Sequence, residues 1–234
     1  MGEIENQEQP EKMASFFDLR ATGYDVHIKD VVYTDEEFEQ FYQAISQPIA
    51  PTEQPLKILD LGCGTGLELA PLLQRVPNAQ ITGMDVSINM LRLLEEKYPA
   101  QQRQITLKAA SYLDESLGSQ EYDYIISAMS LHHLLPDTKQ KLYQKIYLAL
   151  KPGGQYIEGD TVTRKDMENE FLAEYEGQIK QMLPAANGHY HIDIPFSIDT
   201  QKELLLGAGF KQFKLIWEKD YAAVWNAAVY VATT

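Results

Sequence analysis

Short apolar runs alternate with amphipathic stretches through the middle of the chain. The runs have the length of buried strands, while the stretches between them repeat apolar side chains at helical spacing. This alternation predicts an α/β fold in which a mostly parallel sheet carries helices on both faces. The predicted strands are residues 57–61, 80–84, 104–108, 122–127 and 154–158, and the predicted helices between them are residues 67–75, 88–97 and 138–150.

The C-terminal part departs from this alternation. It predicts a short helix at residues 201–206, which Gly207 and Gly209 end. Two apolar runs follow at residues 213–217 and 227–232 with little between them. That spacing predicts an antiparallel hairpin at the edge of the sheet.

Two further segments predict a helical cap over the sheet. Between residues 13 and 46, aromatic and apolar residues recur with helical spacing, whereas residues 1–11 are polar enough to be disordered. Residues 163–197 form an insertion after the fifth strand, and insertions of this length are commonly lids or binding loops. The chain therefore divides into a tail with cap helices at 1–55 and a main domain at 56–234 that contains the cap insertion.

The acidic composition bears on the partners of the protein. The 234 residues carry a formal net charge of −14 at pH 7, whereas nucleic-acid-binding proteins usually show a basic patch. The densest lysine cluster follows one predicted helix and the turn after it, which favours a solvated helix face. These lysines are Lys139, Lys141, Lys145 and Lys151. The charge disfavours a nucleic-acid partner and favours a small-molecule substrate.

Other features bear on the compartment. Cys63 is the one cysteine, which excludes an internal disulfide and fits a reducing compartment. No apolar run approaches the ~20 residues that span a bilayer, and residues 1–12 are polar and mostly acidic, unlike a signal peptide. These features predict a cytoplasmic protein without a membrane partner. Trp217 and Trp225, near the sheet edge, fit either a core or a homodimer interface.

The loop after the first predicted strand carries the most chemical information. Asp60 is followed by glycine at every second position, and glycine lets a backbone adopt positive φ and approach a ligand closely. These glycines are Gly62, Gly64 and Gly66. Their spacing differs from the G-x-G-x-x-G of dinucleotide-binding enzymes, which disfavours an oxidoreductase that uses NAD. The Asp60 carboxylate suits a ligand with a cationic group better than a phosphate.

Asp85 ends the second predicted strand, the position from which an α/β fold binds a ribose. Together with the glycine loop, it resembles the class I S-adenosylmethionine (SAM)-dependent methyltransferases, whose signature after the first strand is D-x-G-x-G-x-G. The resemblance extends from about residue 56 through the Pro152-Gly153-Gly154 turn into the C-terminal hairpin. It implies a Rossmann-like, seven-stranded, mostly parallel sheet with an antiparallel C-terminal hairpin, and it implies SAM as the cofactor.

The resemblance also implies which residues contact the cofactor. Asp85 would accept the ribose hydroxyls, and the Ala128 carbonyl would receive the ammonium group. Ser111 stands where the family often has an acidic residue for the adenine amino group, which makes Asp114 an alternative. The implied cofactor-binding residues are Tyr24, Asp60, Gly62, Cys63, Gly64, Gly66, Asp85, Val86, Met90, Ser111, Tyr112 and Ala128.

Methyl transfer from a sulfonium is an in-line displacement, which an enzyme accelerates mainly by alignment and exclusion of water. A hydroxyl or carbon-acid acceptor would also need a general base. The candidate catalytic residues are His133 after the fourth strand, Asp160 after the fifth, and His189 or His191 in the insertion. Since adjacent histidines point in different directions, we expect only one of His132 and His133 to face the pocket, and His133 is our choice.

The insertion also contains the pattern His189-x-His191-x-Asp193. Alternate residues of an extended segment share one face, which would suit a metal. Metal sites need three or four ligands with supporting partners, however, and no further cysteine or acidic-histidine cluster is visible. We therefore interpret the pattern as a polar loop and expect no metal.

The sequence thus predicts a SAM-dependent methyltransferase that acts on a small-molecule acceptor. The alternatives are a tRNA-modifying or protein methyltransferase and a non-catalytic SAM-binding regulatory protein. The net charge disfavours tRNA, and the segment after the fourth strand lacks the Asn-Pro-Pro-Tyr type of motif found in common nucleobase and glutamine N-methylating enzymes. The identity of the acceptor, and whether oxygen, nitrogen, sulfur or carbon is methylated, stay open.

Overall fold

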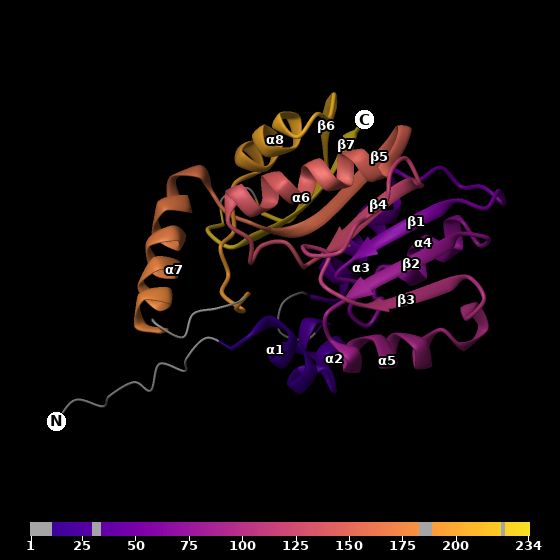
Figure 1. Cartoon of the computed structure of the whole chain (residues 1–234), viewed down its shortest axis with the longest axis horizontal. Helices are drawn as coiled ribbons and strands as arrows, with labels where there is room; N and C mark the ends of the chain where they lie inside the picture. Colours follow the sequence, from indigo (N-terminus) through magenta and orange to yellow (C-terminus); the bar gives the residue numbers. More distant parts are fainter. Residues whose placement is uncertain (1–10, 30–33, 183–188, 221–222) are drawn as a thin grey trace.

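The computed structural model describes residues 11–29, 34–182, 189–220 and 223–234. Its centre is a seven-stranded sheet in the order β3-β2-β1-β4-β5-β7-β6 (Figure 1). The strands are β1 (Lys57–Leu61), β2 (Gln80–Asp85), β3 (Ile105–Ala109), β4 (Tyr122–Ala128), β5 (Leu150–Val162), β6 (Gln212–Glu218) and β7 (Asn226–Thr233). Strands β1 to β5 pair in parallel, and β7 pairs antiparallel with both β5 and β6. The predicted Rossmann-like sheet with its antiparallel C-terminal hairpin is confirmed.

Helices cover both faces of this sheet (Figure 1). Side chains of α3, α4 and α5 share a core with one face, and those of α6 and α8 share a core with the other. Successive side chains of β1 point to opposite faces of the sheet, so Ile58 packs in the first core and Leu59 and Leu61 pack in the second. The helices are α1 (Met13–Arg20), α2 (Tyr24–His27), α3 (Asp35–Ser46), α4 (Leu69–Arg75), α5 (Ile88–Lys97), α6 (Pro136–Ala149), α7 (Glu168–Met182) and α8 (Ile198–Gly207).

Local chemistry explains where several helices begin. Ser87 Oγ accepts a hydrogen bond from Met90 N at the start of α5, and Thr34 forms a capping box with Glu37 at the start of α3. Pro136 occupies the first turn of α6, where its missing N–H has no intrahelical partner in any case. The cap at Ser87 is close to the site, because it fixes the turn between β2 and α5.

The order of the strands reverses between β1 and β4. The chain passes outward from β1 through β2 to β3, and then returns to place β4 on the other side of β1. In open α/β sheets, ligands bind outside the carboxyl ends of the strands at such a reversal. The glycine loop after β1 and the segment after β4 therefore meet where a ligand site is expected.

Strand β5 differs most from its prediction. It begins at Leu150 rather than at residue 154, and it continues to Val162. Its early part pairs with β4 across a register shift between Tyr122 and Tyr124. The register shift allows β5 to contain a turn at Gly153, whose φ is +80°, while its pairing with β4 continues on either side.

The lysines of α6 form the predicted solvated face only in part, since Lys141 is exposed but Lys139 and Lys145 are not. Lys139 is fully buried, with its Nζ 3.4 Å from Glu158 Oε1 and 3.1 Å from Gln201 Oε1. Lys145 donates to two backbone carbonyls at 2.9 Å. The prediction was wrong for Lys139 because helical spacing carries no information about a carboxylate that β5 places over the helix.

The N-terminal segment and the insertion after β5 are joined to each other. Met13 N donates to His189 O at 3.0 Å, and His191 N donates to Glu11 O at 2.9 Å. Helix α1 also lies against α5 (Figure 1). The two predicted cap segments thus form one connected structure at the edge of the site, while their role as a lid stays a prediction.

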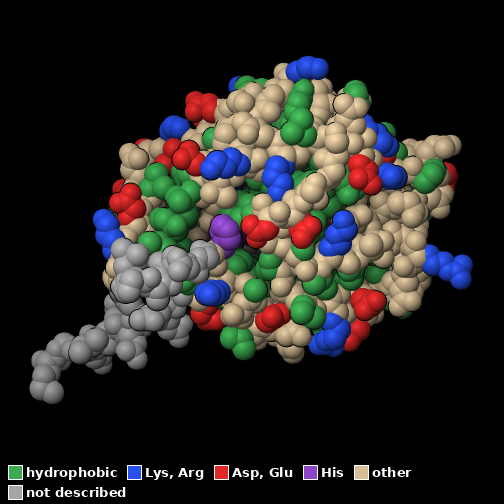
Figure 2. Space-filling view, in the orientation of Figure 1, with side chains coloured by type: hydrophobic (Ala, Val, Ile, Leu, Met, Phe, Trp, Pro, Cys, Tyr) green, Lys and Arg blue, Asp and Glu red, His purple; other side chains and the backbone are tan. Residues whose placement is uncertain are grey.

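Charged side chains of both signs lie on the surface. On the face shown in Figure 2, acidic and basic side chains are interspersed, with apolar side chains between them. Among the described residues, no helix combines the length and apolarity that a membrane crossing requires.

Candidate active site

The glycine loop forms a tight turn at the carboxyl end of β1. Gly62 and Gly64 have positive φ angles of +71° and +48°. A Cβ at Gly62 would overlap the side chain of Ser130, whereas a Cβ at Gly64 would meet nothing closer than 4.0 Å. Gly62 therefore lets the segment after β4 pack against the loop, and Gly64 leaves open space beside the backbone.

Asp85 holds this turn in place from the end of β2. Its Oδ2 accepts a hydrogen bond from Gly64 N at 2.9 Å, and its Oδ1 accepts one from Ser87 N at 2.8 Å. Burial raises the pKa of Asp85, and these backbone N–H groups oppose the rise. Each carboxylate oxygen has more than one acceptor site, so Asp85 can accept further hydrogen bonds from a ligand.

Asp60 lies buried beneath the loop, next to the buried Glu68. No N–H or O–H group of the described residues donates a hydrogen bond to Asp60, and its only side-chain hydrogen-bond partner among them is the neighbouring carboxyl of Glu68. Burial raises the pKa of Asp60 well above its usual range, and the charge of Glu68 raises it further. Two buried carboxyl groups without a cation are unfavourable when ionised, so a positive ligand group beside the loop would stabilise them.

A cavity of about 240 Å³ opens above the glycine loop. We call it the smaller cavity. Asp114, the alternative acid for the adenine, lines it together with most of the predicted cofactor-binding residues. Those residues are Tyr24, Gly62, Gly64, Asp85, Val86, Met90, Ser111, Tyr112 and Ala128. Asp60, Cys63 and Gly66 support the loop from below, since Asp60 and Cys63 are buried and Gly66 packs close to Leu94.

A second cavity of about 660 Å³ adjoins the first. We call it the larger cavity. It lies between α1, α2, the segment after β4 and the loop of the insertion, and Phe17, Tyr24 and Met129 line both cavities. Met129 adopts a φ of +49°, which is uncommon for a residue other than glycine. Such conformations persist where the surrounding structure enforces them, and they are concentrated at functional sites.

Comparison with known proteins agrees with this geometry. Residues 58–154, which contain the glycine loop and Asp85, match the sequence model of a family described as a methyltransferase domain. Carboxy-S-adenosyl-L-methionine synthase of Campylobacter hominis is 28% identical over an alignment of 238 positions, gaps included, that covers 96% of this chain and 96% of that protein. The chain carries a methyltransferase domain of the class I SAM-dependent type.

Two phosphoethanolamine methyltransferases are also similar to this methyltransferase. The phosphoethanolamine N-methyltransferase of Plasmodium falciparum is 26% identical over 171 residues, which cover 73% of this chain and 58% of that protein. The solved structure of phosphoethanolamine N-methyltransferase 2 of Haemonchus contortus, in complex with phosphomonomethylethanolamine and S-adenosylhomocysteine, has a TM-score of 0.69 at 17% identity. It matches 93% of this chain and 58% of its own, and it shows the shared fold. The methyltransferase thus spans less than two thirds of the length of both proteins.

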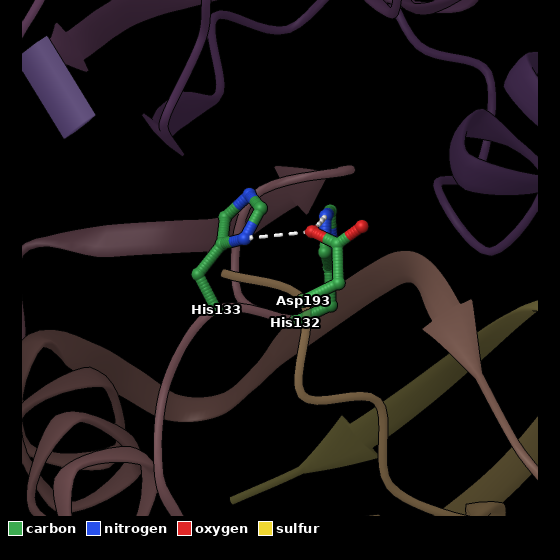
Figure 3. Close-up of side chains that lie close together, drawn as sticks. All are labelled: His132, His133 and Asp193. Carbon is green, nitrogen blue, oxygen red and sulfur yellow. Dashed lines mark ion pairs between the residues drawn. The ribbon is translucent and has the colours of Figure 1, made fainter. Parts of the chain in front are cut away.

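A polar cluster lies in the wall of the larger cavity of the methyltransferase. His132 Nδ1 lies 2.5 Å from Asp160 Oδ1, and His132 Nε2 lies 3.5 Å from Asp193 Oδ1. His133 Nδ1 lies 3.0 Å from the same Asp193 oxygen (Figure 3). The His191 ring stands beside that of His133, with 4.5 Å between their centroids. Segments from three parts of the chain thus bring these side chains together.

The members of this cluster differ in their electrostatics. Burial opposes the charged form of His132, yet the Asp160 carboxylate raises its pKa. Burial lowers the pKa of His133, and it lowers the pKa of His191 to about 4. His133 and His191 are therefore neutral near pH 7, with nitrogen lone pairs that can accept a proton or bind a cation.

The three predicted catalytic residues occupy different places. His133 lines the larger cavity, and His189 lines the smaller one. Asp160 is fully buried against His132, and its two oxygens also accept backbone N–H bonds at 2.8 Å. The structure therefore connects His133 to Asp160 through His132 but places His189 in the other cavity, and the catalytic roles of all three stay predictions.

Sequence reasoning missed part of the cluster. The expectation that only one of His132 and His133 faces the pocket was wrong, because both line the larger cavity. The two follow β4 in an irregular turn rather than in an extended segment, so strand alternation does not apply to them. The pair of adjacent histidines was the sequence signal that could have indicated the cluster. No sequence signal indicated the contact of His132 with Asp160.

Proposed function

We propose that this chain transfers the methyl group of SAM to a small-molecule acceptor, with SAM in the smaller cavity and the acceptor in the larger one. The observation that carries the proposal is that the two cavities adjoin and share Phe17, Tyr24 and Met129 as lining residues. An in-line displacement needs the methyl group and the attacking atom in direct contact. Adjoining cavities supply that geometry.

The smaller cavity suits SAM in charge and in shape. SAM supplies a methyl group on a sulfonium cation, together with a ribose and an ammonium group. In this proposal Asp85 accepts the ribose hydroxyls, and the open space at Gly64 admits the ligand next to the backbone. The ammonium end would stabilise the charged form of Asp60, which is buried beside Glu68 and receives no N–H or O–H hydrogen bond from the described residues. Met90 packs against the adenine.

The larger cavity supports a small acceptor rather than a polymer. Its volume of about 660 Å³ suits a metabolite-sized molecule. The net charge of −14 opposes a nucleic-acid substrate. The relatives reported above are named for carboxy-SAM and for phosphoethanolamine, both of which are small molecules.

The first test is calorimetric titration of the purified chain with SAM, with S-adenosylhomocysteine and with NAD. Micromolar binding of the first two ligands, and none of NAD, is the expected result. A screen of small hydroxyl, amine, thiol and carbon-acid acceptors then follows, with S-adenosylhomocysteine measured by mass spectrometry. Tight SAM binding without turnover of any acceptor would favour a regulatory protein, and NAD binding alone would contradict the proposal.

A second candidate function is the synthesis of carboxy-SAM. The observation that favours it is the 28% identity to a carboxy-SAM synthase across 96% of both chains. The same mass spectrometry distinguishes the two functions. Methyl transfer gives S-adenosylhomocysteine and a methylated acceptor, whereas the synthase reaction takes a carboxyl group from a carboxylic-acid co-substrate, which the assay must include, and gives a species heavier than SAM by one carbon dioxide.

Replacing Gly64 with valine is expected to abolish SAM binding while the protein stays folded. A Cβ there meets nothing of the protein within 4.0 Å, so the valine side chain would occupy space assigned to the ligand. The positive φ adds a strain of about 1–2 kcal/mol. Gly153→Val is the matched control, because Gly153 also has a positive φ and open space for a Cβ, away from both cavities.

Both variants should therefore lose similar stability in urea denaturation, and only Gly64→Val should lose SAM affinity in calorimetry. Retained SAM affinity in a folded Gly64→Val protein would refute the placement of the cofactor beside this loop.

A further inference from the structure

We propose that His132, His133 and Asp193 bind one divalent first-row metal ion, such as zinc, in the wall of the larger cavity. From the sequence alone, the His189-x-His191-x-Asp193 pattern is interpreted as a polar loop, and no metal is expected. The fold instead brings Asp193 of that loop to the two histidines that follow β4 (Figure 3). Only the role of the metal toward the acceptor rests on the proposed function.

The distances suit a metal site. One ligand atom from each residue can be chosen so that all three lie within 4.8 Å of one another. Asp193 Oδ1 lies 3.0 Å from His133 Nδ1 and 3.5 Å from His132 Nε2. Ligands at 2.0–2.1 Å from a tetrahedral zinc ion are roughly 3.3 Å apart. Small side-chain adjustments would therefore complete a three-ligand site.

His132 also has the supporting partner that metal-binding histidines usually have. Its Nδ1 lies 2.5 Å from Asp160 Oδ1, and Asp160 is fully buried and fixed by two backbone N–H bonds. A carboxylate on one ring nitrogen fixes the ring orientation and makes the other nitrogen a better ligand. The other nitrogen of His132 is the one that faces Asp193.

Hydrogen bonding satisfies the cluster only in part. His132 Nδ1 contacts Asp160, and His133 Nδ1 also lies 3.3 Å from Ile192 O. Asp193 Oδ1, however, is buried without a hydrogen bond of acceptable geometry from the described residues, although two imidazole nitrogens lie close to it. A buried oxygen without a hydrogen bond calls for an explanation, and a bound ion is one. A cation bound between the two imidazole nitrogens and this oxygen would satisfy all three.

The backbone holds the two ligand segments together. Ile194 N donates to His132 O at 2.7 Å, and the Ile194 side chain is fully buried. This bond fixes Asp193, the residue before Ile194, beside the histidine turn. His191 is not part of the site, because its ring stacks on Phe16 with 3.5 Å between centroids and 9° between planes.

Three protein ligands leave one position of a tetrahedral ion open, which is the arrangement of catalytic rather than structural zinc sites. All three ligands line the larger cavity, so the open position faces the proposed acceptor. A metal there would bind an acceptor oxygen and lower the pKa of its hydroxyl. The proton then leaves to solvent, the oxygen attacks the methyl carbon, and the carbon–sulfur bond of SAM breaks to release S-adenosylhomocysteine. The acceptor class is therefore an alcohol, phenol or enol, and His133 acts as a ligand rather than as a base.

The test is direct metal binding by the full chain, without any acceptor. Protein treated with a chelator and dialysed is titrated with Co²⁺ and with Zn²⁺, followed by visible absorption for cobalt and by calorimetry for zinc. The expected result is one ion per chain, with the d–d absorption of a four- or five-coordinate cobalt site.

The variants decide which residues bind the ion. Asp193→Asn and His133→Asn should each weaken the binding by more than about 100-fold, since loss of an outer partner alone costs 10–100-fold. Asp160→Asn should weaken it by about 10–100-fold for that reason. His27→Ala is the control, because His27 lines the same cavity outside the cluster, and it should leave the affinity unchanged.

Absence of stoichiometric binding by the unmodified chain would overturn the proposal, and so would equal affinity in Asp193→Asn. Urea denaturation of the same samples shows that each variant is folded. SAM titration separates this proposal from the proposed function, because a chain that binds the metal but not SAM would refute only the latter.

Discussion

Replacing Asp85 with alanine is expected to weaken SAM binding by about 2–4 kcal/mol, the range for the loss of a charged hydrogen-bond partner in a closed site. That corresponds to roughly 30- to 1,000-fold in the dissociation constant. Asp85 lines the smaller cavity and accepts a hydrogen bond from Gly64 N of the turn that it holds. The contact with the ribose hydroxyls would be lost entirely, because alanine offers no acceptor.

A second variant separates the two roles of Asp85. The carboxylate also fixes the glycine loop through Gly64 N and the start of α5 through Ser87 N. Asp85→Asn keeps one acceptor oxygen but loses the charge and the second acceptor. We expect it to bind SAM more tightly than Asp85→Ala and more weakly than the unmodified protein.

Calorimetric titration with SAM measures the effect, and Asp123→Ala provides the control. Asp123 is also a strand carboxylate that accepts a backbone N–H, from Lys57 at 2.8 Å, but it lies at the amino end of β4, opposite the end that carries the site. Its replacement should leave SAM affinity unchanged. Unchanged affinity in a folded Asp85→Ala protein would show that the ribose binds elsewhere.

The parts of the fold that the sequence predicted are those with local signals. Each parallel strand is a short apolar run, and each crossover helix repeats apolar residues at its own period, so both can be recognised within a window of a few residues. The helix at Ile88–Lys97 was predicted to the residue, since Ser87 caps it and Met90 begins its apolar stripe. The glycine loop is equally local, because its function depends on residue types at adjacent positions.

The parts that the sequence did not predict depend on contacts between distant segments. Asp193 joins His133 only because Ile194 binds the backbone of His132 across the fold. Met129 adopts a positive φ without any sequence signal for it. The histidines that follow β4 and the acid of the insertion could each be selected as polar residues in loops. Their meeting at one point is a property of the tertiary structure.

The burial of Lys139 in the core also depends on contacts between distant segments. We expect its replacement to have a large effect on stability. Its Nζ lies 3.4 Å from Glu158 Oε1, and neither side chain is exposed. Glu158 Oε2 also accepts hydrogen bonds of 2.8 Å from the hydroxyls of Tyr143 and Tyr156. This buried network joins α6 to β5, and Gln201 extends it to α8. Two residues beyond Glu158, the same strand carries Asp160, so the network also supports the strand end at the proposed active site.

Lys139→Met is expected to lower the free energy of unfolding by about 3–5 kcal/mol, because it leaves Glu158 buried without a countercharge. Urea denaturation at pH 7 measures the change, and Lys141→Met is the control. Lys141 is exposed on the same helix, and its replacement should change stability by less than about 0.5 kcal/mol.

The double variant Lys139→Met with Glu158→Gln tests the cause. If an uncompensated charge produces the loss, neutralising Glu158 should restore a large part of it, since removing both members of a buried pair is often nearly neutral. If the loss came from packing alone, the two substitutions would add or worsen each other. A Lys139→Met protein as stable as Lys141→Met would show that the buried carboxylate needs no cation. The two tyrosine hydroxyls would then be sufficient to hold Glu158 in the core.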